Sequence, residues 1–469
     1  MKNKLVFGVL WSVVEVIIKR VLDTVIKLIL ANLLFADDFG IIAMATVFIS
    51  FIQVLNEAGM GLAIIQKKTI NEKLLNTVFW SNLFWSIFLF IILSFLLAPI
   101  AASFYNQPIL EQIIPVLSLS ILMRALNTVH SAQLRRELHF KKLAFISNVS
   151  TFIGGTVAIV MAFLGFGVWC LVAYTLITYI ITTPLYFNAT KWKPKLQWDK
   201  SAFKEIISFG LYTTSTMMLL NIISNADYLL LGKWVSAAAV GIYSIAYMMT
   251  NQVSGQISTM VDRVMYPFYS SLQEDTGKIK EYYIKQVRYY VLALYPIMLT
   301  LLLFSSDIVL VFFGSQWEES ILPLKILSLS VMISILTGGY NLLFRSIGKP
   351  KYEFKIQVII SVFIYLPCLI SGIYIYGLTG AAIGILISRL ISFFVHQYVL
   401  KKNFDIKIKN VLSNNGSIII LCFLMSLLVF GLRALNVKEV FIMVSYVLVF
   451  GFSYFMLFKS DFLKIVQKK

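Results

Sequence analysis

The sequence predicts an all-α integral membrane protein, a two-lobe bundle of six plus six transmembrane helices followed by a C-terminal helix pair. Composition, the spacing of apolar stretches and the distribution of positive charge lead to this prediction. Of 469 residues, 59% are hydrophobic and only 13% are charged, whereas soluble domains carry about 25% charged residues. The chain therefore has too little polar surface for a soluble protein.

Apolar stretches of about 20 residues recur along the whole chain, and this is the length that a helix needs to cross the hydrocarbon core of a bilayer. The predicted spans begin near residues 8, 39, 75, 110, 143, 167, 205, 238, 289, 321, 353, 378, 416 and 440. The sequence thus predicts fourteen spans.

Positive charge alternates between the loops on the two sides of the membrane. If the N-terminus is cytoplasmic, the cytoplasmic loops hold most of the 40 lysines and arginines, and the opposite loops hold only Lys233, Arg433 and Lys438. This asymmetry follows the positive-inside rule and predicts that both termini are cytoplasmic. The net charge of +18 is then explained by topology and by anionic lipid headgroups, so no nucleic-acid partner is expected.

The first twelve predicted spans form two similar halves. The matching positions, with slowly rising offsets of 201 to 212 residues, are Gly40 and Gly241, the LSLS segments at 117–120 and 327–330, Arg135 and Arg345, and Gly165 and Gly377. An even number of spans in each half predicts two parallel lobes that face each other across a cleft. We expect an N-lobe over residues 1–190, a C-lobe over 191–400 and two further helices over 401–469.

The first predicted span carries five charged residues, Glu15, Lys19, Arg20, Asp23 and Lys27. Each ion at the bilayer centre costs about 2.5–3.5 kcal/mol. Four of them recur every fourth residue and therefore share one helix face, with Arg20 beside it. We expect this face to line a wet, protein-lined interior; the alternative is an amphipathic helix lying along the membrane surface.

Other charged residues within the spans fit the same interior, namely Arg124, Arg263 and Glu57. For each of them, snorkelling to the interface or a structural ion pair is an alternative to substrate contact. Positive charge predominates in the expected interior, and a cationic interior suits a phosphate group.

Residue patterns for catalysis are not found in the sequence. His130, His139 and His396 belong to no metal-binding or triad motif, and no phosphate-binding loop for ATP is present. The cysteines Cys170, Cys368 and Cys422 lie inside apolar runs, which favours packing over disulfides or metal ligation. We therefore expect no enzyme activity, no catalytic residues, no metal and no bound cofactor.

Several blocks carry a family resemblance, in the order LLFADDFGIIAMA, LRRELHFKKLA, KWKPKL, VDRVMYPFYSSLQED and FFGSQWEES. Together they resemble the polysaccharide transporter family, the Wzx-type flippases of lipid-linked oligosaccharides, and within it the WzxC/TuaB-like exporters. That family belongs to a superfamily with the MATE transporters and the lipid II flippase MurJ, so the resemblance implies a MATE-like core of twelve helices.

The resemblance also implies a function. Such a protein moves undecaprenyl-pyrophosphate-linked repeat units from the cytoplasmic to the outer leaflet of the bacterial inner membrane by alternating access. The product serves lipopolysaccharide or exopolysaccharide, and candidate partners are membrane lipids, a polysaccharide polymerase and export machinery.

Candidate site residues follow from the resemblance and the cationic interior together. The expected substrate-binding residues are Lys19, Arg20, Lys27, Arg124 and Arg263. The expected coupling carboxylates, for a proton or sodium gradient, are Glu15, Asp23 and Glu57. A MATE-like multidrug exporter, which would need an acidic site for cations, is the alternative, and a polymerase or ligase would need a large external loop.

The predicted topology can be tested with single cysteines and an impermeant thiol reagent, in a background whose native cysteines are replaced. Cysteines at Gln107 and Gln316 are expected to react from outside the cell, because both loops are predicted to be external, and one at Lys193 is not. The opposite labelling pattern would contradict the model.

Overall fold

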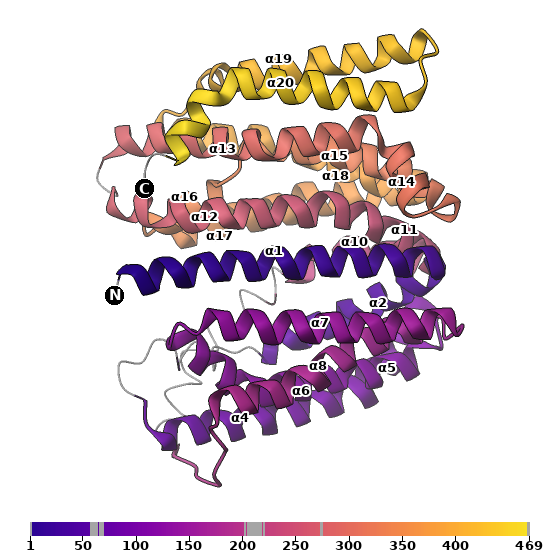
Figure 1. Ribbon diagram of the computed structural model, residues 1–469, viewed down its shortest axis with the longest axis vertical. Coiled ribbons are helices and arrows are strands. Elements are labelled where there is room, and N and C mark those ends of the chain that lie inside the picture. The colour runs from indigo at the N-terminus through magenta and orange to yellow at the C-terminus, as the bar shows by residue number, and fades with distance from the viewer. Residues whose placement is uncertain are drawn as a thin grey trace. The chain divides into compact units, whose positions relative to one another are not determined.

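The chain is α-helical throughout its described part and forms no strand there in the computed structural model (Figure 1). The backbone is described over residues 2–56, 64, 70–200, 203, 218, 221–272 and 275–466; side chains are described within these ranges from 18 to 456, except at 276, and at 459. The all-α prediction is confirmed.

Ten helices of the described chain are long and apolar enough to cross a membrane. The protein is therefore a multi-pass membrane protein. The count of fourteen spans stays a prediction, because the span expected from residue 205 lies mostly outside the described residues. One of the ten, Pro350–Phe404, is long enough for two crossings.

By its internal contacts the chain divides into two compact units. Unit 1 comprises Met1–Ser244 and Phe312–Trp317, and unit 2 comprises Ile245–Val311 and Glu318–Lys469. This division is based on contacts between residues, whereas the predicted lobes are based on matching positions in the sequence. The predicted lobe boundaries therefore stay a prediction.

Unit 1 contains most of the helices of the first half of the chain. Its elements are α1 (Lys2–Leu33), α2 (Ala36–Asn56), α4 (Glu72–Ile91), a π-helical turn (Ile92–Leu97), α5 (Ala98–Tyr105), α6 (Leu110–Arg136), α7 (Phe140–Phe163), α8 (Trp169–Thr190), α10 (Ala226–Trp234) and most of α11 (Ala237–Tyr247). Within it α1 packs along α7, α7 on α8, α8 on α6 and α6 on α4.

Two adjacent glycines let α7 lie between α1 and α8. A Cβ atom at Gly155 would come within 2.2 Å of Ile26 on α1, and one at Gly154 within 2.3 Å of Thr178 on α8. Small residues allow helices in membranes to approach closely. Both neighbours of α7 are thus drawn in at the same level of the bundle.

The repeat-related glycines Gly40 and Gly241 face each other's helices inside unit 1. A Cβ atom at Gly40 would lie 1.8 Å from the carbonyl oxygen of Ala237, and one at Gly241 would lie 1.9 Å from that of Ala36. The two contacts mirror each other, because each glycine approaches a carbonyl oxygen at the start of the other helix. This contact explains why the beginning of α11 belongs to unit 1.

The C-terminal end of α1 binds the short segment Phe312–Trp317. Gln316 Nε2 and Trp317 Nε1 both donate to the carbonyl oxygen of Ala31, at 2.6 and 2.8 Å. Asn32 Nδ2 donates to the carbonyl oxygen of Phe312 at 2.7 Å. These bonds satisfy helix-terminal carbonyls, which otherwise lack partners.

Unit 2 contains the remaining helices. Its elements are a π-helical turn (Met248–Gln252), α12 (Val253–Ser271), α13 (Thr276–Leu303), α14 (Ser305–Phe312), a 3-10 turn (Ser315–Ser320), α15 (Ile321–Ile335), α16 (Tyr340–Ser346), α17 (Pro350–Ile360), a π-helical turn (Ser361–Tyr365), α18 (Leu366–Phe404), α19 (Ile408–Ala434) and α20 (Glu439–Val466); the units divide within α14 and the 3-10 turn.

The long α18 is two helices joined at a break. Tyr376 and Gly377 have non-helical dihedrals, and Gly377 has a φ of 54°. A Cβ atom at Gly372 would come within 2.1 Å of the carbonyl oxygen of Gly380, so the two parts pack against each other through glycines. The break agrees with the predicted span start near residue 378.

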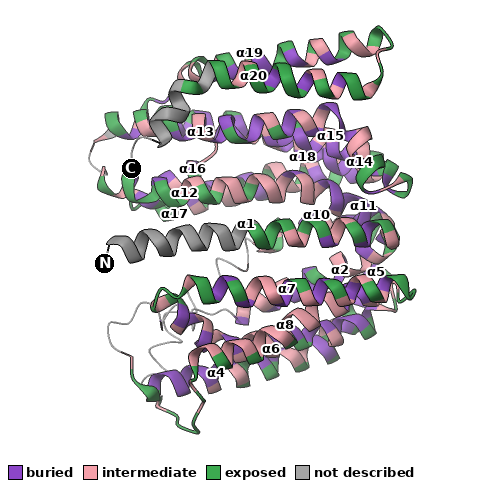
Figure 2. Cartoon of the chain, in the orientation of Figure 1, coloured by how far each residue is buried: buried purple, intermediate pink, exposed green. Residues whose placement is uncertain are grey.

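The helices differ in how much of their length is buried. More than half of the span window is buried in α6 and α13, at 56% and 61%, but only 28% in α19 and 17% in α20 (Figure 2). The helix pair at the C-terminus packs on α13 through α19, and most of its remaining surface is exposed.

The glycine contact between α2 and α11 predicts a large effect of a single methyl group. Gly40→Ala is expected to lower stability by about 1–3 kcal/mol, because the methyl group meets a backbone carbonyl that cannot turn away. Thermal unfolding of the purified protein measures this, with Gly416→Ala as matched control, since nothing lies within 4 Å of the Cβ position there. Equal unfolding temperatures for both variants would contradict the contact.

Candidate functional site

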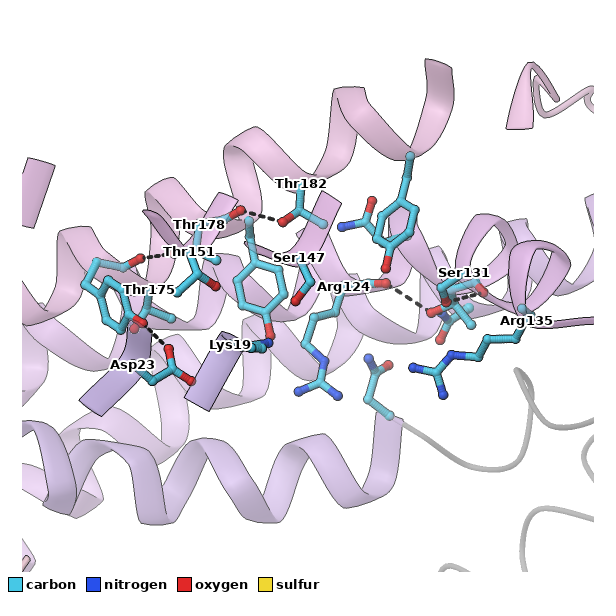
Figure 3. Close-up of a pocket in the computed structure, with 18 residues that line it drawn as sticks. Lys19, Asp23, Arg124, Ser131, Arg135, Ser147, Thr151, Thr175, Thr178 and Thr182 are labelled. Atoms are coloured by element: carbon cyan, nitrogen blue, oxygen red, sulfur yellow. Dashed lines mark hydrogen bonds between the residues drawn. The ribbon is translucent and has the colours of Figure 1, made fainter. Parts of the chain in front are cut away.

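A cavity of about 700 Å³ lies inside unit 1, between the helices that pack around α7 and α8 (Figure 3). Its size is typical of a site for a small ligand. The lining residues are Lys19, Asp23, Asn56, Asn82, Arg124, Asn127, Thr128, Ser131, Ala132, Arg135, Ser147, Thr151, Tyr174, Thr175, Thr178, Tyr179, Thr182 and Tyr186. All but Ala132 have a polar side chain.

Helical periodicity builds this polar lining. On α6 a stripe at positions i, i+4, i+7 and i+11 comprises Arg124, Thr128, Ser131 and Arg135. On α8 a stripe with a period of four runs from Tyr174 through Thr178 and Thr182 to Tyr186. Residues three and four apart share a helix face, so each helix turns one polar face to the cavity.

The face of α8 that lines the cavity, here called the α8 wall, contains Thr175, Thr178 and Thr182. Their hydroxyl groups donate hydrogen bonds within the helix. Thr175 Oγ1 donates to the carbonyl oxygen of Leu171 at 3.2 Å, Thr178 Oγ1 to that of Tyr174 at 2.6 Å, and Thr182 Oγ1 to that of Thr178 at 2.7 Å. A hydroxyl that donates in this way keeps lone pairs as acceptors. These three residues therefore offer acceptors to the cavity.

One carboxylate joins the walls of the cavity. Asp23 on α1 accepts a hydrogen bond from the phenol of Tyr174 on α8, across the level at which Gly154 and Gly155 bring both helices against α7. The half-buried carboxylate thus has a neutral donor. In unit 2, Asp262 similarly accepts hydrogen bonds from Tyr290 and Gln286.

Cations outnumber anions around the cavity. Lys19, Arg124 and Arg135 line it, and Asp23 is the one acidic residue among its described lining. Figure 3 places Arg135 and Ser131 at one end, Asp23 and Thr175 at the other, and Lys19 and Arg124 between them. Arg124 and Arg135 are eleven residues apart on α6, which corresponds to about 16 Å along the axis.

The structure brings together only some of the residues expected from the sequence. Lys19, Asp23 and Arg124 line the cavity, whereas exposed Arg20 and half-buried Lys27 on α1 do not. Arg263 is exposed on α12 in unit 2. The side chain of Glu15 and the whole of Glu57 lie outside the described residues. The predicted binding and coupling roles of all these residues stay predictions.

The packing of α1 bears on its two alternatives. From residue 18 onward α1 packs along α7, and Ile26 and Leu30 are buried. This agrees with a helix of the bundle, as expected from the charge pattern, better than with a helix on the membrane surface.

Sequence reasoning missed Arg135 and the α8 wall as parts of a site. The sequence analysis used Arg135 only as one of the cytoplasmic positive charges that set the topology and as one of the matching positions of the repeat. The signal on α8 was present, because tyrosines and threonines recur at four-residue spacing from Tyr174 to Tyr186. Among the described residues, no group of histidine, cysteine, aspartate and glutamate could hold a metal ion.

Comparisons with known proteins agree on one family. The model of a family described as polysaccharide biosynthesis protein matches residues 29–322. The chain is 24% identical over 408 residues to the lipopolysaccharide biosynthesis protein WzxC of Escherichia coli K12, covering 86% of the chain and 82% of WzxC. It is 23% identical over 360 residues to the teichuronic acid biosynthesis protein TuaB of Bacillus subtilis 168, covering 75% and 73%.

Solved structures share the fold at low sequence identity. The lipid II flippase MurJ in an inward closed conformation superposes with a TM-score of 0.76 and 17% identity, covering 98% of this chain and 99% of MurJ. An inward-facing multidrug resistance MATE transporter gives 0.61 and 15%, covering 84% and 98%. The predicted MATE-like fold is confirmed by these likenesses.

The bond between Asp23 and Tyr174 predicts coupling between the two side chains. In a double-mutant cycle, Asp23→Asn and Tyr174→Phe are expected to show an interaction energy of about 1 kcal/mol, since hydrogen bonds between membrane helices are of this order. The measurement is the free energy of unfolding in lipid bicelles. A control cycle combines Tyr174→Phe with Asp37→Asn, an exposed residue in the first turn of α2, and should show no interaction energy. Equal interaction energies in both cycles would contradict a direct bond between Asp23 and Tyr174.

Proposed function

The chain belongs to the family of polysaccharide biosynthesis proteins, and from this premise we propose that it is a flippase that moves a lipid-linked oligosaccharide across the membrane. WzxC is named for the biosynthesis of lipopolysaccharide and TuaB for that of teichuronic acid. A multi-pass helical protein without a catalytic motif suits transport of a precursor better than its chemical modification.

The cavity in unit 1 carries the proposal. Three cations and many hydroxyl and amide groups line one cavity within a bundle of membrane helices. Ionised groups in such a bundle are costly, so a cluster of them around a cavity indicates a ligand that is itself charged and polar. A pyrophosphate attached to sugars has both properties.

Arginine and lysine would share the binding of the pyrophosphate. The guanidinium groups of Arg124 and Arg135 present forked donors that match phosphate oxygens. Among the described residues, Lys19 and Arg135 form no ion pair, so their charges are available to a ligand. Lys19 would add a compact positive charge between Arg124 and the Asp23 end of the cavity (Figure 3).

The finer details extend the resemblance seen in the sequence. The proposed substrate is an undecaprenyl-pyrophosphate-linked repeat unit, moved from the cytoplasmic to the outer leaflet of the bacterial inner membrane by alternating access, with both termini cytoplasmic. A polysaccharide polymerase and export machinery would act on the product. A proton or sodium gradient would supply the energy, with Asp23 as a described candidate for the coupling carboxylate.

A MATE-like multidrug exporter is the second candidate, because a multidrug transporter shares the fold. Binding of cationic drugs needs an excess of negative charge. The cavity has three cations against one carboxylate among its described lining residues, and this balance favours an anionic substrate.

Removal of the central cation tests the proposal. Arg124→Ala is expected to lower surface polysaccharide at least tenfold in a host that lacks its own flippase, because loss of one partner of a desolvated charge pair costs about 2–5 kcal/mol. Arg124→Lys should keep part of the export.

Two further variants complete this experiment. Lys73→Ala removes an exposed charge from the first turn of α4, outside the cavity, and should export normally. Arg20→Ala reports whether an exposed cation of α1 also takes part. Normal export by Arg124→Ala, at a normal amount of folded protein in the membrane, would contradict the assignment of the cavity.

A further inference from the structure

The cavity is chemically different at its two ends. The end marked by Arg135 is cationic, and the end marked by Asp23 and Thr175 carries the carboxylate and hydroxyls (Figure 3). A ligand with two chemically different parts can therefore lie in only one direction.

The carboxylate end offers hydrogen-bond acceptors held in fixed positions. One oxygen of Asp23 accepts from Tyr174, and no described residue bonds to the other oxygen. Thr175 and Thr178 donate to carbonyl oxygens of their own helix, so their lone pairs remain. Groups whose rotamers are already fixed lose little entropy when a ligand binds.

Fixed acceptors select a ligand rich in donors. A sugar carries several hydroxyl groups, and each can donate to a carboxylate or to a threonine oxygen. A ligand carboxylate has no hydrogen to donate when ionised, and Asp23 would repel it. The carboxylate end is therefore suited to an uncharged sugar.

The charge balance points in the same direction. Lys19, Arg124 and Arg135 exceed the single carboxylate of the described lining by two positive charges. Each phosphate of a pyrophosphate diester is ionised at neutral pH, so bound pyrophosphate would neutralise this excess. No described cation of the lining is then left over for an acidic sugar.

We infer that the Asp23 end of the cavity binds the sugar next to the pyrophosphate and selects an uncharged sugar at this position. The pyrophosphate lies between Arg124 and Arg135, and the first sugar donates its hydroxyl hydrogens to Asp23, Thr175 and Thr178. This inference rests on the proposed flippase function and adds the orientation of the headgroup and the residues that set specificity.

Binding of three synthetic lipids to the purified protein in nanodiscs tests the inference. The probes are a short polyprenyl pyrophosphate without sugar, the same lipid with a neutral hexose, and the same lipid with a hexuronic acid. The hexose is expected to tighten binding by about three- to tenfold over the sugarless probe, the effect of one or two hydrogen bonds. The hexuronic acid should bind more weakly than the hexose.

Variants separate the sugar from the pyrophosphate. Asp23→Asn and Thr175→Val should each abolish the gain from the hexose. Thr175→Val keeps the charge of the cavity and should leave binding of the sugarless probe unchanged, whereas Asp23→Asn removes a negative charge and should not weaken it. Thr156→Val is the matched control, because Thr156 on α7 is exposed, lies outside the cavity lining and also donates within its helix. Arg124→Ala should weaken binding of all three probes by the same factor.

The outcomes distinguish failure of the inference from failure of the proposed function. If no probe binds, or if Arg124→Ala binds all of them normally, the proposed function fails. If the probes bind but Asp23→Asn keeps the full gain from the hexose, or the hexuronic acid binds as tightly as the hexose, the inference is wrong. If Asp23→Asn abolishes transport but still binds the hexose probe more tightly than the sugarless and hexuronic acid probes, Asp23 is a coupling residue and the inference is also wrong.

Discussion

An ionised side chain in a hydrocarbon layer must be paired with protein groups or kept in a polar cavity, because it otherwise costs about 2.5–3.5 kcal/mol at the centre of the layer. Asp23 meets this requirement through the phenol of Tyr174. The bond joins α1 to α8, and the glycines at 154 and 155 leave room for both helices against α7. The residues that hold α1 and α8 against α7 therefore also place polar groups in the cavity of unit 1.

The sequence predicted the existence of this polar face but not its exact direction. Apolar spans and the four-residue charge period on the first helix depend only on composition and spacing, so they could be found without a structure. Lys19 and Arg20 differ by one position, or about 100° around the helix. Only the packing of α1 against α7 decides that Lys19 lines the cavity and Arg20 does not.

The polar wall of α8 was hidden for another reason. Threonines that donate to carbonyl oxygens of their own helix satisfy their hydrogens locally, so they are tolerated in a span and do not interrupt its apolar character. Their common direction depends on how α8 is rotated against α6 and α7. Sequence spacing shows that these residues share a face, but it does not show which helices that face meets.

The two halves predicted from the sequence repeat differ in their electrostatics. Arg345, the repeat equivalent of Arg135, forms a bidentate ion pair with Glu353 at 2.7 and 3.2 Å. At the same offset the first half has Leu143 in place of Glu353. A single acidic partner thus compensates the charge of Arg345 in unit 2, whereas no described acidic residue pairs with Arg135 beside the cavity.

The self-bonded threonines of α8 also bear on how such a protein adapts during evolution. Each hydroxyl bonds within its own helix, and a change from threonine to valine keeps the branched shape of the side chain. The acceptor pattern of the wall can therefore change one group at a time without changing the helix contacts that hold the bundle together. Under the proposed function, the ligand preference of this face can therefore diverge between relatives while the fold stays the same.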